Sequence, residues 1–341
     1  MAEAITIDGS FGEGGGQILR SSLALSVVTG RAFRVHNIRA NRDRPGLRRQ
    51  HLTAVNAAAA ISGATVEGAA VGSNELSFSP TSVRPGEYEF DIGSAGSTTL
   101  VLQTVLPPLL KAPGPSVLTL VGGTHNPGGP PLDFLEKAFL PIIRRMGPGV
   151  EVELERPGFA PNGGGRWTVL VQPAAKLSPV RLTERGNVRR REGRVVVAGL
   201  PQHIVEREMD TAAQVAGWPR EAFRAEQLPA EWGPGNVVLL EVESEGLTEV
   251  FSSVGQRGIS AERVARDAAR QAVRYLEAGV PVGDCLADQL LLPMALAGGG
   301  AYVTLPLTRH SRTNIEVIRM FLDVRIEARE VGKDAWAVEV M

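Results

Sequence analysis

The stretch "GSFGEGGGQILRSS", residues 9–22, joins a short apolar segment to a helical pattern. The segment "AITID" (4–8) predicts a strand, and the apolar spacing of "GGGQILRSSLALSVVTG" predicts a helix that ends at Gly30. Glycines between a strand and a helix allow backbone conformations and close approaches that other residues resist. The stretch therefore predicts either a phosphate site at a helix N-terminus or a tight turn that binds no ligand.

The same order of elements recurs further along the chain. "AFRVHNI" (32–38) predicts a strand, and it is followed by a helical pattern that stops at Gly63 and by two short strands. "YEFDIG" (88–93) then predicts a strand before another Gly/Ser-led helix. Two successive units of roughly 85 residues indicate an internal duplication, and a third unit is expected at the C-terminus. The sequence thus predicts an α/β (α+β) fold of three repeated βαβαββ units.

Residues 183–277 have a different composition from the repeats. The polar run "TERGNVRRR" (183–191) precedes mixed strand and helix patterns, which end in the amphipathic stretch "SAERVARDAARQAVRYLEAG". We expect a small α+β domain inserted into a catalytic core of three repeats, which residues 1–182 and 278–341 form. For the three arginines at 189–191, the sequence favours a solvated linker over a binding site.

Composition limits the class of protein. The chain has 341 residues, of which 43% are hydrophobic and 21% charged, and its net charge is −1, so it is globular and has no bulk basic footprint for nucleic acid. No apolar run has membrane-spanning length, and "MAEAITIDGS" does not resemble a secretory signal. Cys285 is the single cysteine and cannot form an internal disulfide. We therefore expect a cytoplasmic protein without a membrane partner.

The glycine-rich stretch does not match the common nucleotide-binding motifs. The Lys of a P-loop is missing, and the glycine spacing is not that of a dinucleotide fingerprint. Glu13 lies inside the loop and Arg20 lies one helical turn beyond it. Because a carboxylate repels phosphate unless a cation lies between them, Glu13 predicts a Mg²⁺ or Mn²⁺ ligand. The alternative is a helix-start carboxylate that the helix dipole stabilises.

The strongest basic cluster follows the first predicted helix. Residues 31–51 contain seven Arg and two His but one Asp. The segment covers a strand, a Pro/Gly turn and a helix start, so we expect its charged side chains to converge on one opening in the protein surface. This pattern favours phosphate or polyanion binding over a solvated face. Aromatic residues do not alternate with the arginines, so extended base stacking is not predicted.

His310 is the histidine with the most suggestive surroundings. It lies in "LPLTRHSRTN" (305–314), just after an apolar strand and among hydroxyl, amide and Arg side chains. The chain has no helical His pair with metal-ligand spacing and no G-x-S-x-G elbow. His310 is therefore either a nucleophile or acid–base group, or simply a hydrogen-bonding residue at a polar strand end.

Taken together, the chain resembles the RNA 3′-terminal phosphate cyclase family. The resemblance covers nearly the whole chain and implies repeats like the C-terminal domain of translation initiation factor three, with a smaller domain inserted before the last repeat. The matching stretches are "GEGGGQILR", "RPGLRRQHLTAV", "GSAGSTTLVLQTVLPPLL", "GGT" with "PPLDFLEKAFLPIIRRMG", "GFAPNGGG", "LADQLLLPMALAGGG" and "TRHSRTNIEVI".

The resemblance implies a reaction, a set of ligands and a set of residues. An RNA 3′-phosphate end becomes a 2′,3′-cyclic phosphate at the expense of ATP, through AMP carried on His310, with Glu13 holding Mg²⁺ or Mn²⁺. At Cys285 the family usually has Tyr or His. The other implied positions are Gln17, Arg20, Gln103, Pro130, Cys285, Leu286, Ala287, Asp288 and Gln289 for ATP, and Arg39, Arg42 and His51 for phosphate or RNA.

Two other functions stay open on the sequence. One is a non-catalytic RNA-binding relative that acts in ribosome assembly, and such relatives lack the histidine that matches His310. The other is an enzyme like the enolpyruvyl transferases, whose repeats have a related architecture and which need no ATP. The presence of His310 favours the cyclase. A homo-oligomer is compatible with the sequence.

Overall fold

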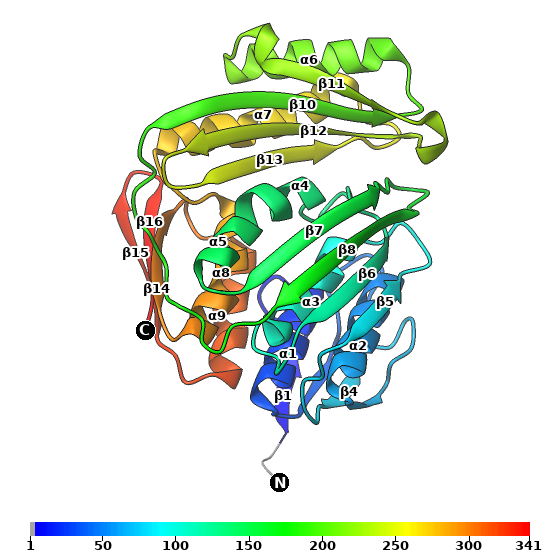
Figure 1. The fold of residues 1–341 in the computed structure, drawn as a ribbon, viewed down its shortest axis with the longest axis vertical. Coiled ribbons are helices and arrows are strands. Elements are labelled where there is room, and N and C mark those ends of the chain that lie inside the picture. Colours follow the sequence, from blue (N-terminus) through cyan, green and yellow to red (C-terminus); the bar gives the residue numbers. More distant parts are fainter. Residues whose placement is uncertain (1–3) are drawn as a thin grey trace.

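The computed structural model of the protein describes residues 4–341. Over this range the chain forms four four-stranded sheets with helices between them (Figure 1). Three of the sheets share one strand order, in which the first strand pairs with the second, the second with the fourth, and the fourth with the third. The predicted α/β class with three repeated units is therefore confirmed.

The first repeat contains the glycine-rich stretch and the basic cluster. Its parallel pair is β1 with β2, and its other pairs are antiparallel. Both helices end at a glycine in the left-handed region, Gly30 (φ 71°) and Gly63 (φ 58°), as the sequence predicts. Its elements are β1 (Ile5–Asp8), α1 (Gly16–Thr29), β2 (Phe33–His36), α2 (Arg49–Ser62), β3 (Thr65–Glu67) and β4 (Leu76–Ser79).

The second repeat repeats this order with an irregular second helix. A π-helical segment, Leu135–Phe139, separates α4 from α5. The repeat is anchored inside by Trp167, whose indole Nε1 donates to Thr98 Oγ1 at 2.8 Å. Its elements are β5 (Glu87–Asp91), α3 (Thr98–Leu109), β6 (Ser116–Gly122), α4 (Leu132–Phe134), α5 (Leu140–Arg145), β7 (Gly149–Arg156) and β8 (Gly165–Gln172).

The third repeat is split by the inserted segment. Its first strand, β9, has two residues and precedes the insertion, whereas the family resemblance places the insertion before the whole repeat. A strand of this length is too short to produce an alternating pattern. The elements of the repeat are β9 (Arg181–Leu182), α8 (Asp284–Ala297), β14 (Gly300–Thr304), α9 (Arg309–Phe321), β15 (Ile326–Gly332) and β16 (Ala335–Val340).

The inserted segment has its own sheet and its own hydrophobic core, which lie above the repeats in Figure 1. The arginines at 189–191 lie inside β10, so the linker interpretation is wrong, and β11 was not predicted. The boundaries 183–277 stay a prediction, because part of the sheet packs in this core, whereas Val196, Val237 and Leu239 pack in the core of the repeats. The elements are β10 (Val188–Ala198), α6 (Gln202–Ala216), β11 (Phe223–Leu228), β12 (Gly235–Ser244), β13 (Thr248–Val254) and α7 (Ala261–Ala278).

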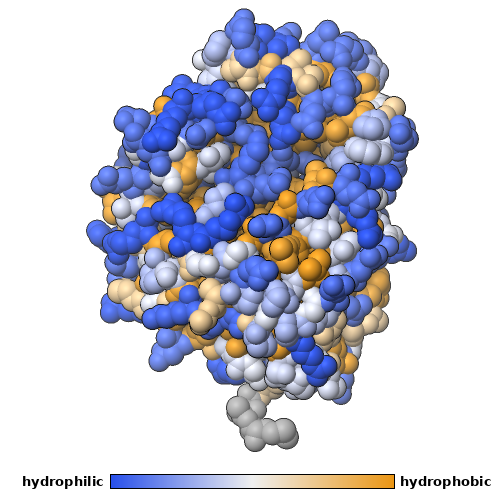
Figure 2. All heavy atoms as spheres, in the orientation of Figure 1, coloured by the Kyte–Doolittle hydropathy of each residue, from blue (hydrophilic) through white to orange (hydrophobic). Residues whose placement is uncertain are grey.

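Helices from all three repeats meet near the middle of the molecule. α1 packs on both α3 and α9, and α8 packs on α9 and on the π-helical segment below β13. The face in Figure 2 is mostly hydrophilic, with hydrophobic side chains gathered near its middle. In the part of the chain described, no helix is both long and apolar enough to cross a bilayer. The cytoplasmic location stays a prediction.

Candidate active site

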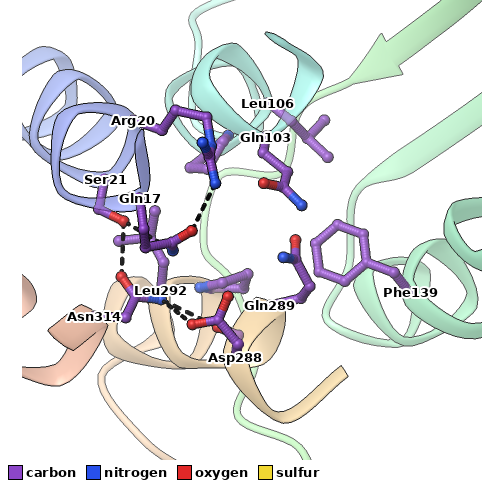
Figure 3. A pocket seen from close by; sticks show the side chains of 12 residues that line it. Gln17, Arg20, Ser21, Gln103, Leu106, Phe139, Asp288, Gln289, Leu292 and Asn314 are labelled. Carbon is purple, nitrogen blue, oxygen red and sulfur yellow. Dashed lines mark hydrogen bonds between the residues drawn. The ribbon is translucent and has the colours of Figure 1, made fainter. Parts of the chain in front are cut away.

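A cleft of about 330 Å³ opens where the three repeats and the inserted domain meet. α1, α3, α8 and α9 supply its lower walls, and β13 and α7 supply the wall from the inserted domain. Beneath it lies a narrow cavity of about 40 Å³ (Figure 3). The residues that line both spaces are Gln17, Arg20, Gln103, Asp288 and Gln289.

Each of the three central helices places a glutamine in this cavity. Gln17 on α1, Gln103 on α3 and Gln289 on α8 line it, and the amides of Gln103 and Gln289 face each other (Figure 3). Gln17 Oε1 accepts a hydrogen bond from Arg20 Nη2 at 2.7 Å. Within residues 4–341, the buried Nε2 of Gln103 and Nε of Arg20 have no hydrogen-bond partner. Buried donors of this kind are costly unless a ligand or water accepts from them, so the cavity is suited to a polar guest.

The glycine-rich loop leaves the start of α1 open. Gly12 (φ 56°) and Gly14 (φ 61°) adopt left-handed conformations that suit glycine. The N-cap residue is Gly15, so no side chain satisfies the first amides of the helix. These amides and the helix dipole can therefore serve an anion. The bend also brings Glu13 back over the helix start, because a Cβ at Gly15 would meet the Glu13 carboxylate.

Glu13 lies between Arg42 and His310. Its side chain is 7% exposed, and Oε1 is ion-paired with Arg42 and lies 3.9 Å from His310 Nε2. Oε2 is buried and makes no hydrogen bond to any residue from 4 to 341. The first turn of α1 contains no acidic residue of its own, but the Glu13 carboxylate lies over the start of the helix, so both the metal-ligand and the helix-start interpretations of Glu13 stay predictions.

His310 lies in the first turn of α9, at the mouth of the cleft. The Thr308 side chain caps this helix by accepting from Ser311 N at 3.1 Å. The imidazole is 53% exposed. Burial of the rest lowers the pKa of His310, Arg20 and Arg42 lower it further, and Asp288 opposes them. A lowered pKa keeps the ring neutral at neutral pH, which leaves one ring nitrogen with a free lone pair.

A chain of hydrogen bonds links α9 to α1 and α8. Ser21 Oγ on α1 donates to Asn314 Oδ1 at 2.7 Å, and Asn314 Nδ2 donates to Asp288 Oδ1 at 3.2 Å (Figure 3). Thr313 Oγ1 accepts from the backbone N–H of Glu13 at 2.9 Å and ties the glycine loop to the same helix. Burial raises the pKa of Asp288, whereas His310 and Arg20 lower it. This network fixes the position of His310 relative to the loop.

The basic cluster divides into residues at the site and residues that shape a loop. Arg42 reaches Glu13, but Arg39 (φ 56°) donates to Arg44 O at 2.7 Å and Gly46 O at 2.9 Å. His51 is buried, and its Nδ1 accepts from Arg48 N at 3.2 Å. Burial, together with Arg20, Arg39 and Arg48, lowers the pKa of His51 to about 3.

His51 is therefore a neutral ring whose remaining nitrogen carries the proton. That nitrogen, Nε2, faces Gly16 at the start of α1, where a Cβ would collide with it. His51 thus contributes a donor, and no charge, beside the open helix start.

Some of the remaining predicted residues line the cleft and others do not. Pro130, Cys285, Asp288 and Gln289 line the cleft. Leu286 and Ala287 are buried in the core and line neither space. The residues that sequence reasoning missed are Thr313, Asn314, Ser252 and Gln271, of which the first two stand in the polar run after His310. No grouping of three or more His, Cys, Asp or Glu side chains suited to a metal occurs between residues 4 and 341.

Known proteins resemble this chain over almost its full length. A protein named RNA 3′-terminal phosphate cyclase from Ectopseudomonas mendocina is 51% identical over 98% of this chain and 98% of its own. Proteins of the same name from Koribacter versatilis and Pseudomonas fluorescens are 52% and 51% identical over 96% and 99% of this chain, and 92% and 98% of their own.

A solved structure and a family model complete the comparison. The enolpyruvyl transferase NikO from Streptomyces tendae matches 99% of this chain and 48% of its own at 11% identity, but its TM-score of 0.37 is too low to support an argument. The model of the RNA 3′-terminal phosphate cyclase family matches residues 11–328. The chain therefore belongs to the RNA 3′-terminal phosphate cyclase family, which is a family of enzymes.

Proposed function

We propose that this enzyme uses ATP to convert an RNA 3′-phosphate end to a 2′,3′-cyclic phosphate, with His310 as the nucleophile that carries AMP. The observation that carries the proposal is the place of His310. A ring kept neutral by its lowered pKa stands at the mouth of a nucleotide-sized cleft, 3.9 Å from a buried carboxylate and beside an open helix start.

The side chains that line the cleft differ in polarity, and we place the nucleotide by this difference. Arg20, His310 and the nearby start of α1 offer donors and positive charge to a triphosphate. Leu100, Phe134 and Val250 are apolar lining residues that suit a base. In this placement the α-phosphorus lies beside His310, as attack by its imidazole requires.

The reaction needs three displacements at phosphorus. A neutral His310 nitrogen forms a bond to the α-phosphorus as the bond to pyrophosphate breaks. An oxygen of the RNA 3′-phosphate then attacks that phosphorus and releases the imidazole, giving an RNA–phosphate–AMP anhydride. Finally, the 2′-hydroxyl attacks the 3′-phosphorus, loses its proton and expels AMP. Arg20 and Arg42 offset the charge on the phosphoryl oxygens.

The residues present fit a divalent cation in part. Glu13 Oε2 is a buried oxygen without a partner in the described chain, and it would be the protein's ligand to Mg²⁺ or Mn²⁺. Phosphate oxygens and water would supply the rest, which is usual for Mg²⁺. A bound cation neutralises charge on the triphosphate. The ion pair of Glu13 with Arg42 meanwhile holds that carboxylate over the helix start.

An end-group assay tests the proposal. The protein is incubated with Mg²⁺, ATP and a 5′-labelled RNA that ends in a 3′-phosphate. The expected product resists phosphatase, and one AMP and one pyrophosphate appear per end converted. A matched RNA whose terminal nucleotide lacks the 2′-hydroxyl is the control, and we expect it to accumulate as the adenylylated end. A phosphatase-sensitive end after ATP consumption would contradict the proposal.

A further inference from the structure

The inserted domain supplies one wall of the nucleotide cleft. Val250 and Ser252 of β13 and Gln271 of α7 line it, together with Pro130 and Phe134 of the second repeat. With the triphosphate placed beside Arg20 and His310, the base packs on the apolar lining, which includes Val250 of this wall. The polar side chains of the same wall, Ser252 and Gln271, are therefore candidates for contacting the base.

Gln271 is held with its amide in one orientation. Its Nε2 donates to Ser252 O at 3.1 Å and to Asp267 O at 3.0 Å, so both amide hydrogens are in use. A flipped amide would place its oxygen against two carbonyl oxygens, which the network forbids. Across residues 4–341, no side chain or backbone group donates to Oε1. Gln271, which lines the cleft, therefore has a free acceptor and no free donor.

We infer that Gln271 is a specificity-determining residue, whose fixed Oε1 accepts from the exocyclic amino group of adenine. The inference rests on the ATP site proposed above. A 6-oxo purine, such as that of ITP, presents an acceptor at this place, so two acceptors would oppose each other and one would stay unsatisfied. The inserted domain thereby selects the nucleotide, and the repeats perform the chemistry.

A second acceptor, at the start of α8 in the third repeat, gives the rival assignment. Asp284 also lines the cleft, and its Oδ2 is paired with Arg274 Nη1 at 2.8 Å. If Asp284 reads the base, changes at Gln271 leave the preference for ATP intact. The rival is therefore an outcome that the experiment separates.

The experiment compares ATP with ITP in the full-length chain carrying His310→Ala, in which no adduct on His310 forms, so that calorimetry reports binding alone. With Gln271 present, ATP should bind about three- to tenfold more tightly than ITP. Gln271→Leu removes the acceptor and should bring the ratio of the two dissociation constants to within about twofold of one. Gln271→Lys places a donor at the same position and should make ITP the tighter ligand.

The control is Gln214→Leu, the same change at an exposed glutamine of α6, also in the inserted domain. It should leave the ratio of dissociation constants unchanged. A ratio that stays the same in both Gln271 variants, with ATP still bound, overturns the inference and favours Asp284. Labelling of the His310 protein by α-labelled ATP is measured in parallel. If labelling fails while the binding ratio shifts, the proposed reaction fails and the reading of the base by Gln271 stands.

Discussion

The helices α1 and α3 hold equivalent places in the first and second repeats but begin differently. α3 is capped by Ser97, whose Oγ accepts from Leu100 N at 3.4 Å, whereas α1 begins after Gly15 with no side-chain cap. A capped start is satisfied by the protein itself. An uncapped start beside a cleft is free to bind an anion. The helix start is thus capped by the protein in the second repeat and available to an anion in the first.

One position along these helices makes a second difference. Gln17 and Gln103 both line the cavity, but Arg20, the fifth residue of α1, stands where the fifth residue of α3 is Leu102. Arg20 is half-buried, and desolvation lowers its pKa to about 10. Desolvation of a cation costs free energy unless a partner offsets it. The repeats thus share one architecture, and a few residues that differ between them account for the open helix start and the positive charge of the first repeat.

Arg20→Leu makes α1 resemble α3 and should have the largest effect. We expect covalent labelling by ATP to slow on the order of 100-fold, because a half-buried cation that faces the phosphates is lost. The midpoint of urea unfolding should not fall, since an apolar residue replaces a desolvated charge. Arg34→Leu, at an exposed ion pair on β2, is the control for the loss of an Arg. Labelling at the parental rate would contradict the role assigned to the difference between the helices.

Gly15→Ala tests the open start itself. Gly15 has φ −121°, so alanine fits the backbone, but its Cβ would push into the Glu13 carboxylate and the Arg42 guanidinium. We expect labelling to slow at least about tenfold with the fold retained, because a misplaced charge pair costs more in the transition state than in the ground state. Initial rates and circular dichroism measure the two effects.

Gly332→Ala is the matched control for this change. The nearest atom to its added Cβ lies at 3.7 Å, which is ordinary contact. It should label at the parental rate. Equal losses in the two alanine variants would mean that the crowding at Gly15 is not the cause.

The pH dependence of labelling tests how the charges around the start of α1 affect the pKa of His310. In the proposed reaction the neutral ring of His310 attacks the nucleotide, and its pKa is lowered, so the acid limb of the rate profile should lie below pH 6.5. Arg42 is one of the groups that lower this pKa. Arg42→Gln should therefore move the acid limb of its residual activity to higher pH. A limb that moves to lower pH, or does not move, would contradict this assignment.

Ser97→Ala is the converse test, on the closed helix, and should have the smallest effect on the reaction. Loss of the cap should lower the free energy of unfolding by about 1 kcal/mol. Labelling should change by less than about twofold, because this helix start binds no phosphate in our account. Urea titration and initial rates give the two numbers. A tenfold loss of labelling, equal to that expected for Gly15→Ala, would remove the functional distinction between the two helices.

Local patterns in the sequence were sufficient for the repeats but not for the way they are joined. Gly30 and Gly63 end their helices as predicted, because a left-handed residue after an apolar pattern is a strong local signal. The two-residue strand β9 gave no periodicity, so the split of the third repeat was not foreseen. The arginines at 189–191 in β10 resembled a linker in the sequence, because the strand that pairs with them is β12, about 50 residues further along the chain.

Local sequence patterns say even less about the contacts between residues of the candidate site. Glu13, Arg20 and His310 stand in recognisable stretches, and the structure brings them together at one cleft. The bond from Glu13 N to Thr313 joins residues 300 positions apart, so no local pattern reports it. Gln271 gave no signal either, because an exposed glutamine on an amphipathic helix is the commonest kind of surface residue.

Covalent labelling by ATP shows whether His310 carries AMP. The protein is mixed with Mg²⁺ and ATP labelled at the α-phosphorus, denatured, and compared with His310→Ala and with Arg34→Leu as a control. We predict one labelled AMP per chain that is released by acid and stable to alkali, as a phosphoramidate is, in the parent and the control but not in His310→Ala. Label that persists in a folded His310→Ala protein would contradict the account.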